Sequence, residues 1–359
     1  MKISTDNDFT TIEGKCSCGS VHFSFDIPST EFPLKTHLCH CSICRYSTGA
    51  PAIFHKVLPT GCKPKYIGAS SEAKLGTYLL QRTGSLSHFC STCGCHVFCT
   101  VPDQDFMVIS TSILTFESRK HVQISKHVHS DSVSDGGIAC MLSRIGDRQL
   151  DVWNPKQEGP SFGVIQPEPE MTHNGKDRLR AECHCKGVSF TLGRPTAEVI
   201  EDEFLQGFVS PTDSTKWVAC FDVCNDCRLV SGTNVIGWCF VALSSCEPQI
   251  GADLEIGTAK IYKSSQGVLR SFCGTCGATV FYSCDDRRKP DGRQAVDIAT
   301  GILRAPEGPM AQNWLTWRSK IGWFDDGKQY DGEFCEALQQ GMNDWSVERY
   351  GETTNFPIG

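Results

Sequence analysis

The pattern of hydrophobic and polar positions predicts a chain built mainly of β-strands. Apolar and polar residues alternate over Val21–Ile27, and the alternation returns over Val188–Leu192. A period of two is typical of a strand with one buried face. Phe106–Ile109 and Ala295–Ile298 are mostly apolar and predict more deeply buried strands. Because no long amphipathic helix with convincing caps is found, the expected fold class is mainly β.

The chain also contains an internal repeat of cysteine-rich blocks. The block Cys16–Phe23 returns as Cys183–Phe190, a separation of 167 positions (183 minus 16). Two further blocks, Cys41–Arg45 and Phe89–Gly94, return 183 positions later as Cys224–Arg228 and Phe272–Gly277. Chemically restrictive residues held in register indicate a duplication. The difference between the two separations places an inserted loop of sixteen residues before Cys224.

The segment between the two copies has the composition of an exposed linker. It is rich in Pro, Glu and Gly, with four prolines between positions 155 and 169. Such a composition favours neither a helix nor a strand. We therefore expect one domain over residues 10–155, a linker over 156–178 and a second domain over 179–350.

The charge and the apolar content of the chain indicate which kinds of partner to expect. The 359 residues suffice for two domains, and the net charge of -7 comes from acidic and basic residues spread along the chain. No basic stripe is present, so we expect no nucleic acid as the main partner. No apolar run approaches the ~20 residues of a membrane span, and the first residues lack the apolar segment of an export signal. We expect a cytoplasmic protein whose 22 cysteines are reduced and whose closely spaced cysteines bind metal.

Two pairs of cysteines in each copy have the spacing of a structural zinc site. A Cys-x-x-Cys-Gly turn directs two thiolates at one ion, and the glycine permits the backbone to turn toward the sulfurs. Two such pairs complete a tetrahedral four-thiolate site, which is typical of structural zinc. The predicted ligands are Cys16, Cys18, Cys90 and Cys93 in the first copy and Cys183, Cys185, Cys273 and Cys276 in the second.

A third cysteine cluster in the first copy has different chemistry. Cys39, Cys41 and Cys44 supply three thiolates without an obvious fourth ligand. Three ligands and a vacancy are typical of catalytic zinc. Three thiolates make zinc a poor activator of water and suit it to an incoming soft thiolate. The neighbouring His40 could complete the shell, act as an acid or base, or point away from the ion.

The corresponding cluster of the second copy departs from this pattern. Asp222 occupies the position of Cys39, while Cys224 and Cys227 are retained. Asp222, Cys224 and Cys227 would give a harder zinc site with stronger Lewis acidity. Cys220 could replace Asp222 as a ligand, or this copy could have lost its metal and serve as a scaffold. Arg45 and Arg228 follow the two clusters, and each could bind a substrate carboxylate or fix its own loop.

These blocks resemble the glutathione-dependent formaldehyde-activating enzyme family, also called the centromere protein V/GFA-like family. The family pattern is Cys-x-Cys-Gly, then Cys-His-Cys-x-x-Cys-Arg, then Cys-x-x-Cys-Gly. The first copy matches all three blocks, whereas the second has Lys186 for the first glycine and Asp222 for a cysteine. The resemblance implies two tandem β-tent (Mss4-like) domains, each with one structural zinc and one labile or catalytic zinc. It also implies a carbon–sulfur lyase-type activity with glutathione as candidate co-substrate.

The leading hypothesis is therefore a zinc-dependent enzyme acting on a thiol adduct of an aldehyde or another small electrophilic metabolite. Its catalytic residues would be the two central clusters. A second hypothesis is a zinc-dependent isomerase or cyclase of a small metabolite. A third is a non-catalytic zinc module that binds a protein. An open metal position at the base of a pocket would favour an enzyme, and a flat capped surface would favour a binding module.

Overall fold

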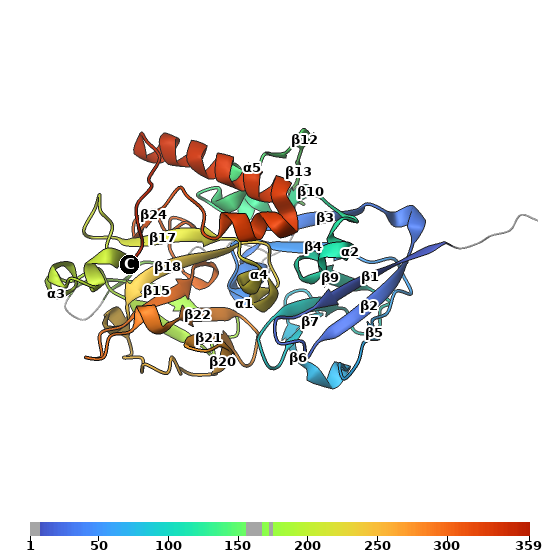
Figure 1. The fold of residues 1–359 in the computed structure, drawn as a ribbon, viewed down its shortest axis with the longest axis horizontal. Helices are drawn as coiled ribbons and strands as arrows, with labels where there is room; N and C mark the ends of the chain where they lie inside the picture. Colours follow the sequence, from blue (N-terminus) through green and yellow to red (C-terminus); the bar gives the residue numbers. More distant parts are fainter. Residues whose placement is uncertain (1–7, 156–166, 172–174) are drawn as a thin grey trace, which may run out of the picture.

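A computed structural model describes residues 8–155, 167–171 and 175–359. It is mainly β, as predicted, with two large sheets and several short helices (Figure 1). The strands predicted from periodicity are present as β2 (His22–Pro28), β16 (Ser189–Leu192), β9 (Met107–Ser110) and β23 (Ala295–Ala299). The apolar side of β2 is buried, so alternation identified its inner face correctly.

The large sheet of the first half has eight strands in the order β13-β10-β3-β4-β9-β8-β7-β6. Their bounds, besides β9, are β3 Leu34–Cys39, β4 Ile53–Val57, β6 Leu75–Leu80, β7 Ser85–Cys90, β8 His96–Thr100, β10 Val122–Val128 and β13 Asp151–Trp153. A smaller sheet joins β2 with β1 (Phe9–Lys15) and β5 (Lys65–Tyr66), and β11 (Arg144–Ile145) pairs with β12 (Arg148–Gln149).

The second half has a similar arrangement, with seven strands in its large sheet and four in its smaller one. Its large sheet follows the order β20-β21-β22-β23-β18-β17-β24, and β24 runs parallel to β17 as β10 runs parallel to β3. The bounds are β17 Trp217–Asp222, β18 Ile236–Ala242, β20 Ala259–Ser265, β21 Val268–Cys273, β22 Thr279–Ser283 and β24 Leu315–Trp317. A smaller sheet joins β14 (Glu170–Met171), β15 (Asp177–Glu182), β16 and β19 (Cys246–Glu247).

Contacts between the halves come in pairs related by the offsets of the sequence repeat. The Ser17 amide donates to the Leu229 carbonyl (3.1 Å), and the His184 amide donates to the Tyr46 carbonyl (2.8 Å). Phe89 faces Phe272 with ring centroids 6.5 Å apart. These are the contacts expected of two similar units that meet through the same surface.

Helices α1 (Ser42–Thr48) and α4 (Asn225–Ser231) lie in the middle of the molecule, between the strands of the two halves (Figure 1). Each ends at a glycine with positive φ, Gly49 and Gly232. A Cβ at Gly49 would lie 2.2 Å from the Thr279 carbonyl oxygen, and one at Gly232 would lie 2.5 Å from the His96 carbonyl oxygen. Both positions therefore require glycine for conformation and for the close approach of the other half.

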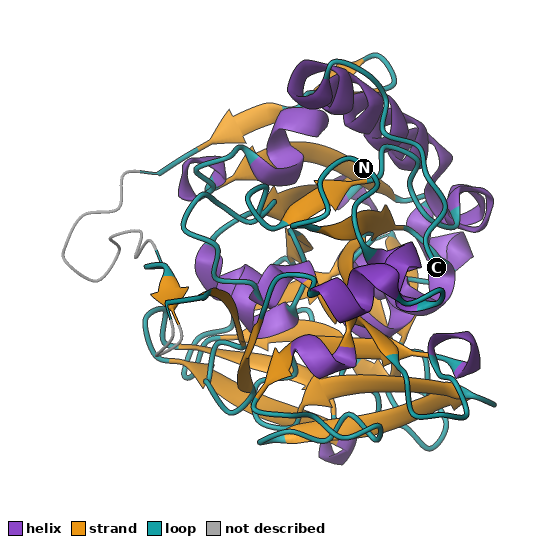
Figure 2. Cartoon of the chain, turned by 90° about the vertical axis from the view of Figure 1, so that its left-hand side faces the viewer, coloured by secondary structure: helices purple, strands orange, loops and turns teal. Residues whose placement is uncertain are grey.

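One helix is long, contrary to the expectation from the sequence. Helix α5 (Phe324–Tyr350) has 27 residues, with a kink at Asp331, whereas α2 (Phe116–Arg119) and α3 (Ala197–Glu201) are short. Its N-cap, Trp323, has positive φ and makes no capping hydrogen bond, so the usual start signal is missing. In Figure 2, helices lie at the top and across the middle of the view, above a large group of strands at the bottom.

Helix α5 comes from the second half but packs against the first. The Phe334 ring meets the Phe54 ring at 5.3 Å, and the Tyr330 hydroxyl donates to the Thr111 carbonyl (3.0 Å). Asp331 forms a largely buried ion pair with Arg119. The larger hydrophobic core accordingly contains residues of both halves. Most of the expected linker, residues 156–166 and 172–174, lies outside the described residues.

Loss of the Phe334 ring should destabilise both halves together. Because both Phe334 and Phe54 are fully or nearly fully buried, Phe334→Ala should lower the free energy of unfolding by about 3–5 kcal/mol. The exposed Val347→Ala on the same helix is the control and should change it little. Denaturant unfolding followed by far-UV circular dichroism measures both. Selective unfolding of the second half, with the first half unchanged, would contradict a shared core.

Candidate metal centres and their cavity

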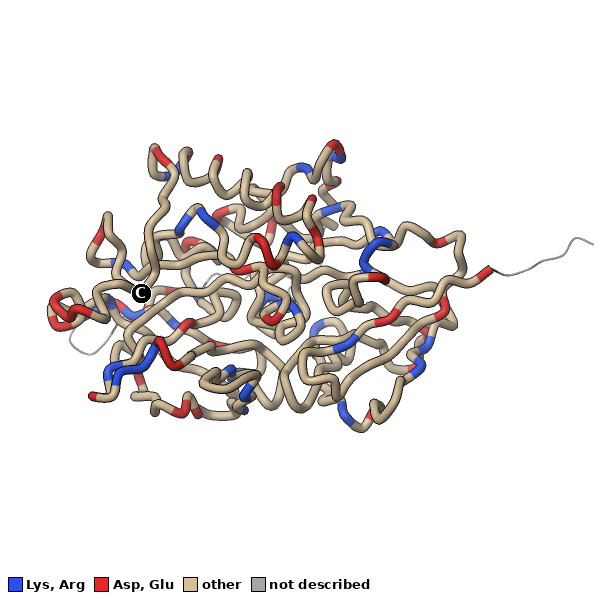
Figure 3. The backbone as a smooth tube through the Cα atoms, viewed as in Figure 1, with Lys and Arg blue, Asp and Glu red and all other residues tan. Residues whose placement is uncertain are grey.

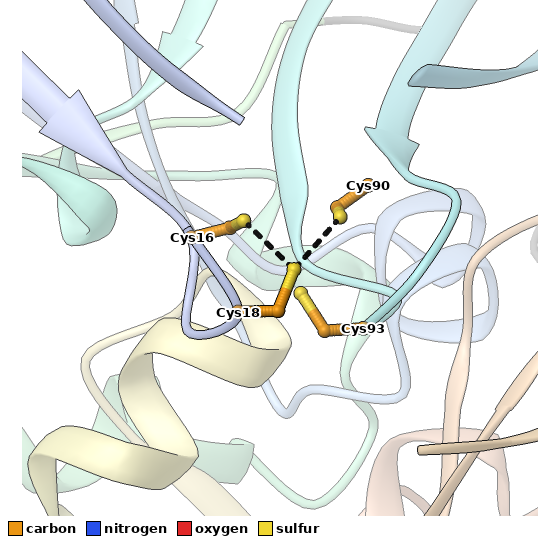
Figure 4. Close-up of side chains that lie close together, drawn as sticks. All are labelled: Cys16, Cys18, Cys90 and Cys93. Atoms are coloured by element: carbon orange, nitrogen blue, oxygen red, sulfur yellow. Dashed lines mark hydrogen bonds between the residues drawn. The ribbon is translucent and has the colours of Figure 1, made fainter. Parts of the chain in front are cut away.

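The four predicted outer ligands of the first half converge on one point (Figure 4). Cys16 and Cys18 lie in the turn between β1 and β2, while Cys90 ends β7 and Cys93 follows it. The Cys18 sulfur lies 3.5 Å from those of Cys16 and Cys90, and all four sulfurs are within 4.8 Å of one another. Zn–S bonds of ~2.3 Å in a tetrahedron separate sulfurs by about 3.8 Å. The cluster therefore fits zinc.

The electrostatics of this cluster also call for a cation. Hydrogen bonding with the neighbouring Cys16, Cys18 and Cys90 sulfurs, together with burial, raises the pKa of the Cys93 thiol. Four adjacent buried sulfurs cannot all ionise unless a positive charge is placed among them. Gly94, with φ of 81°, directs its amide back to the Cys90 carbonyl (2.9 Å) and closes the turn.

The outer ligands of the second half form an equivalent cluster. The sulfurs of Cys183, Cys185, Cys273 and Cys276 lie within 4.8 Å of one another. Backbone amides of Gly187 and Val188 point at the Cys185 and Cys183 sulfurs at 3.4 and 3.3 Å. Lys186 takes the left-handed conformation in which the first copy has a glycine, with φ of 63°. The departure from the family pattern at Lys186 therefore leaves the turn intact.

The central cluster of the first half brings together Cys39, Cys41 and Cys44. Cys39 ends β3, and Cys41 is the N-cap of α1, where its sulfur accepts the Cys44 amide (3.4 Å). The helix N-terminus thus places N–H groups beside a thiolate. The cavity next to Cys44 has a volume of about 30 Å³, which is room for about one water molecule.

His40 points away from this cluster. Its Nε2 lies 2.8 Å from Nδ1 of His127, whose Nε2 is 2.7 Å from the Leu142 carbonyl oxygen. Since the carbonyl accepts, His127 donates from Nε2 and accepts from His40. Burial lowers the pKa of His40 to about 3, which keeps its ring neutral. Of the alternatives for His40, the structure favours a buried structural pair.

The central cluster of the second half consists of Asp222, Cys224 and Cys227. Asp222 ends β17 and accepts the Cys224 amide (2.8 Å), and Cys224 caps α4 as Cys41 caps α1. Burial raises the pKa of the Asp222 carboxyl, so a nearby cation would favour its ionised form. Cys220 lies two residues earlier on the strand and is not a member of this group. Among the described residues, the geometry therefore favours Asp222 as the ligand.

A large cavity opens beside the second-half cluster. Its volume is about 600 Å³, within the range of small-molecule sites. Asp222, Cys224 and Cys227 form part of its wall. The remaining wall includes aromatic and charged side chains from several strands and loops: Trp238, Phe240, Arg270, Tyr282, Arg287, Asp297, Arg318 and Trp323.

The wall residues differ from those at the same positions of the first half. Arg270 lies 183 positions after Ser87, and Tyr282 lies 183 positions after Cys99. The strand register agrees, because Arg270 pairs with Tyr282 as Ser87 pairs with Cys99. Offset and register likewise match Trp238 with His55 and Phe240 with Val57, while Asp297 occupies the place of Val108. Sequence analysis missed these residues. At the fixed offset of 183, the replacement of Ser87 by Arg270 and of His55 by Trp238 was the available signal, whereas Asp297 is matched with Val108 by strand register alone.

Two of the charged wall residues neutralise each other. Arg287 Nε lies 3.0 Å from Asp297 Oδ1, and both side chains are largely buried. Burial raises the pKa of Asp297 to about 6, although the Arg287 charge opposes this shift. A carboxyl with a pKa near neutrality can exchange a proton with a ligand in the cavity.

Arg270 is directed at the metal-binding cluster. It is buried, and its Nη1 lies 3.5 Å from the Cys227 sulfur while Nε donates to Ser264 Oγ (3.1 Å). An ionised Asp222 and two thiolates would exceed the charge of a zinc ion by one. The guanidinium supplies the compensating positive charge. In the first half, Ser87 cannot do this.

Arg45 and Arg228, which follow the central clusters in sequence, bind backbone and side-chain groups of the protein and do not line the second-half cavity. Arg45 donates to the His40 carbonyl (3.2 Å) and is buried. Arg228 donates to the Ser112 carbonyl and to Asn225 Oδ1, and its guanidinium lies 3.5 Å above the Tyr330 ring. Of the two roles considered for these residues, the contacts favour fixing the loop. Neither residue is among those lining the cavity beside the second-half cluster.

Comparison with known proteins supports the resemblance for the first half. Residues 11–132 match the family model described as glutathione-dependent formaldehyde-activating enzyme. The matched segment contains both cysteine clusters of the first half, and the likeness to that family extends over this segment. No significant match was found among curated proteins or solved structures.

Two general features bear on partners. Acidic and basic residues are interspersed over the backbone rather than gathered in one stripe (Figure 3). Within the described part of the chain, no helix combines the length and apolar character needed to cross a membrane.

Replacing one of the four outer cysteines should release the zinc ion and unfold the half that binds it. Cys93→Ser should release one zinc per chain and unfold the first half, because structural zinc contributes on the order of 10 kcal/mol to folding. Cys95→Ser is the matched control, since Cys95 is buried nearby but its sulfur contacts the His96 carbonyl. Metal analysis and thermal melting check both variants. A folded Cys93→Ser protein with undiminished zinc would contradict the structural assignment.

Removing the Arg270 charge should weaken metal binding at the second-half cluster alone. Arg270→Ser, which installs the residue of the first half, should lower zinc affinity there by about 10–100-fold. Ser264→Ala removes the other hydrogen-bond partner of Arg270 and should have little effect. Competition with a chromophoric chelator measures affinity. Equal zinc affinity in Arg270→Ser and the unaltered protein would exclude this role.

Proposed function

We propose that the chain is a zinc-dependent enzyme whose reaction takes place in the cavity of the second half. The substrate class is a thiol adduct of an aldehyde or another small electrophilic metabolite, and the bond made or broken joins carbon to sulfur. The observation that supports this most strongly is the cavity of about 600 Å³ walled by Asp222, Cys224 and Cys227. A binding module would be expected to offer a flat surface over its cluster.

Each part of the cavity has a chemical task in this proposal. Asp222, Cys224 and Cys227 would hold the ion, which when bound supplies Lewis acidity to a substrate sulfur or oxygen. Arg270 balances the charge of these ligands and holds the Cys227 thiolate in place. Asp297, paired with Arg287, can accept or donate the proton that carbon–sulfur bond formation or cleavage releases or requires. The buried Trp238 and Phe240 provide an apolar wall for the substrate.

The first half has a different task in this proposal. Its central cluster has the three thiolates of the family pattern, but the space beside Cys44 admits about one water molecule. Glutathione or a similar thiol adduct cannot enter such a space without movement of the walls. We assign to the first half the support of the shared core, with zinc held structurally.

A second candidate reaction is isomerisation or cyclisation of a small metabolite without a thiol. Two observations favour it as the alternative. Asp222 provides a hard oxygen ligand in place of the soft third thiolate. Asp297 places a carboxyl with a pKa of about 6 in the same cavity. Proton transfer at carbon requires a group of this kind. Dependence of turnover on added glutathione separates the two reactions.

Equivalent cysteines provide a matched test of the active half. Cys224→Ser should lower turnover of glutathione–aldehyde adducts by about 100-fold or more, since it removes an interaction used in the transition state. Cys41→Ser alters the same N-cap position in the first half and should leave kcat/KM within a few fold. Zinc content and melting curves establish that both variants are folded. Turnover lost only in Cys41→Ser would move the reaction to the first half, and turnover kept in both would favour a non-catalytic module.

A further inference from the structure

The cavity of the second half has an aromatic wall that the first half lacks. Trp238 and Tyr282 have ring centroids 6.2 Å apart, and Phe240 lies farther along the same strand as Trp238. The corresponding residues of the first half are His55, Cys99 and Val57, none of which has a comparable flat apolar face. Flat indole and phenol faces bind planar ligands by stacking as well as by burial.

Trp323 adds a further aromatic group at the rim. Its side chain is 70% exposed although tryptophan is usually buried, and it lines the cavity. Its backbone has φ of 56°, a left-handed conformation that is uncommon for a large residue. An exposed indole at the edge of a cavity offers its flat face to a ligand.

Of the three arginines that line the cavity, Arg318 forms no ion pair with a carboxylate of the described residues. Arg270 offsets the ligand cluster, and Arg287 is paired with Asp297. Arg318 donates from Nε to the Lys320 carbonyl (2.9 Å), and the described residues place no carboxylate within ion-pair distance of it. Its outer nitrogens are therefore available for a ligand carboxylate, which a guanidinium binds through two parallel hydrogen bonds.

Three further acidic residues line the same cavity, and among the described residues none of them forms an ion pair with Arg318. Asp226 and Asp286 are exposed at the rim, where solvent screens them. Asp326 accepts hydrogen bonds from the Asn225 amide and side chain at 2.6 and 3.2 Å and so is used in capping α4. An anionic ligand group would therefore bind at Arg318 itself, whose guanidinium forms no ion pair within the described part of the chain.

We propose that the cavity binds a planar aromatic carboxylate, with the ring against Trp238, Tyr282 and Trp323 and the carboxylate at Arg318. This inference rests on the proposed function only in using the same cavity, and it specifies the electrophilic part of the thiol adduct as an aromatic acid. An aliphatic aldehyde such as formaldehyde would leave most of the aromatic wall uncovered.

Binding of simple probes tests the ligand class without turnover. Isothermal titration calorimetry on the zinc-loaded full chain should show saturable binding of 2-naphthoate. The uncharged 2-naphthamide and the non-aromatic cyclohexanecarboxylate should each bind at least about 10-fold more weakly, because a charged pair or a stacked ring is lost. Equal affinity for all three probes would overturn the proposal.

Variants locate the binding site. Arg318→Gln and Trp323→Ala should each weaken 2-naphthoate binding by about 10-fold, and Trp238→His, which installs the first-half residue, should do the same. Trp323 is exposed, so its replacement remains informative if Trp238→His fails to fold. Arg349→Gln, an exposed change on α5, is the control and should bind normally. Unchanged binding in both Arg318→Gln and Trp323→Ala would place the probe elsewhere and overturn the proposal.

The outcomes separate this inference from the proposed function. If 2-naphthoate binds as expected but no thiol adduct is turned over, the ligand class stands and the carbon–sulfur reaction is wrong. If glutathione adducts of aliphatic aldehydes are turned over while 2-naphthoate does not bind, the reaction stands and the aromatic ligand is wrong.

Discussion

The close approach of the two halves is the constraint on which the rest of the structure depends. A Cβ at Gly94 would lie 2.5 Å from the Phe272 ring, and one at Gly277 would lie 2.6 Å from the Phe89 ring. Both glycines have positive φ and also shape the turns that carry the outer cysteines. The same two residues thus govern the metal turn and the interface. Metal binding and association of the halves are therefore linked at each outer cluster.

The helices that carry the central clusters are held in the same way. The Tyr46 and Leu229 carbonyls of α1 and α4 accept amides from the opposite half, next to that half's outer cysteines. Each central cluster is consequently positioned by a helix that the other half supports. Rigid support of this kind keeps ligands in place when the surrounding wall residues change.

Because the metal turns and the helices α1 and α4 are held in the same way in both halves, the residues that line the two cavities can differ. The first half has three thiolates, and the cavity beside Cys44 has a volume of only about 30 Å³. The second half has Asp222 in the cluster and Arg, Trp and Tyr in the wall. One half can then conserve the fold while the other acquires a ligand. The likeness of residues 11–132 to the family model accordingly describes the framework better than it describes the chemistry.

The sequence predicted the strands and the clusters because both depend on local spacing. Alternation over Val21–Ile27 fixes one buried face, and a Cys-x-x-Cys-Gly turn brings its own sulfurs together. The cavity could not be predicted in this way, since Arg270 and Asp297 meet only through the register of separate strands. Helix α5 was missed because its start lacks a capping side chain, although Tyr330, Phe334 and Leu338 follow a helical spacing.

The position of α5 has a consequence for synthesis of the chain on the ribosome. Phe54 lies in the first half, but the ring that covers it, Phe334, is encoded 280 residues later (334 minus 54). At a synthesis rate of about 5–20 residues per second, the apolar surface around Phe54 stays uncovered for tens of seconds. During that interval the surface is open to chaperones and to other nascent chains. Zinc binding by the cluster of Cys16, Cys18, Cys90 and Cys93, which is synthesised early, would stabilise the first half during this interval.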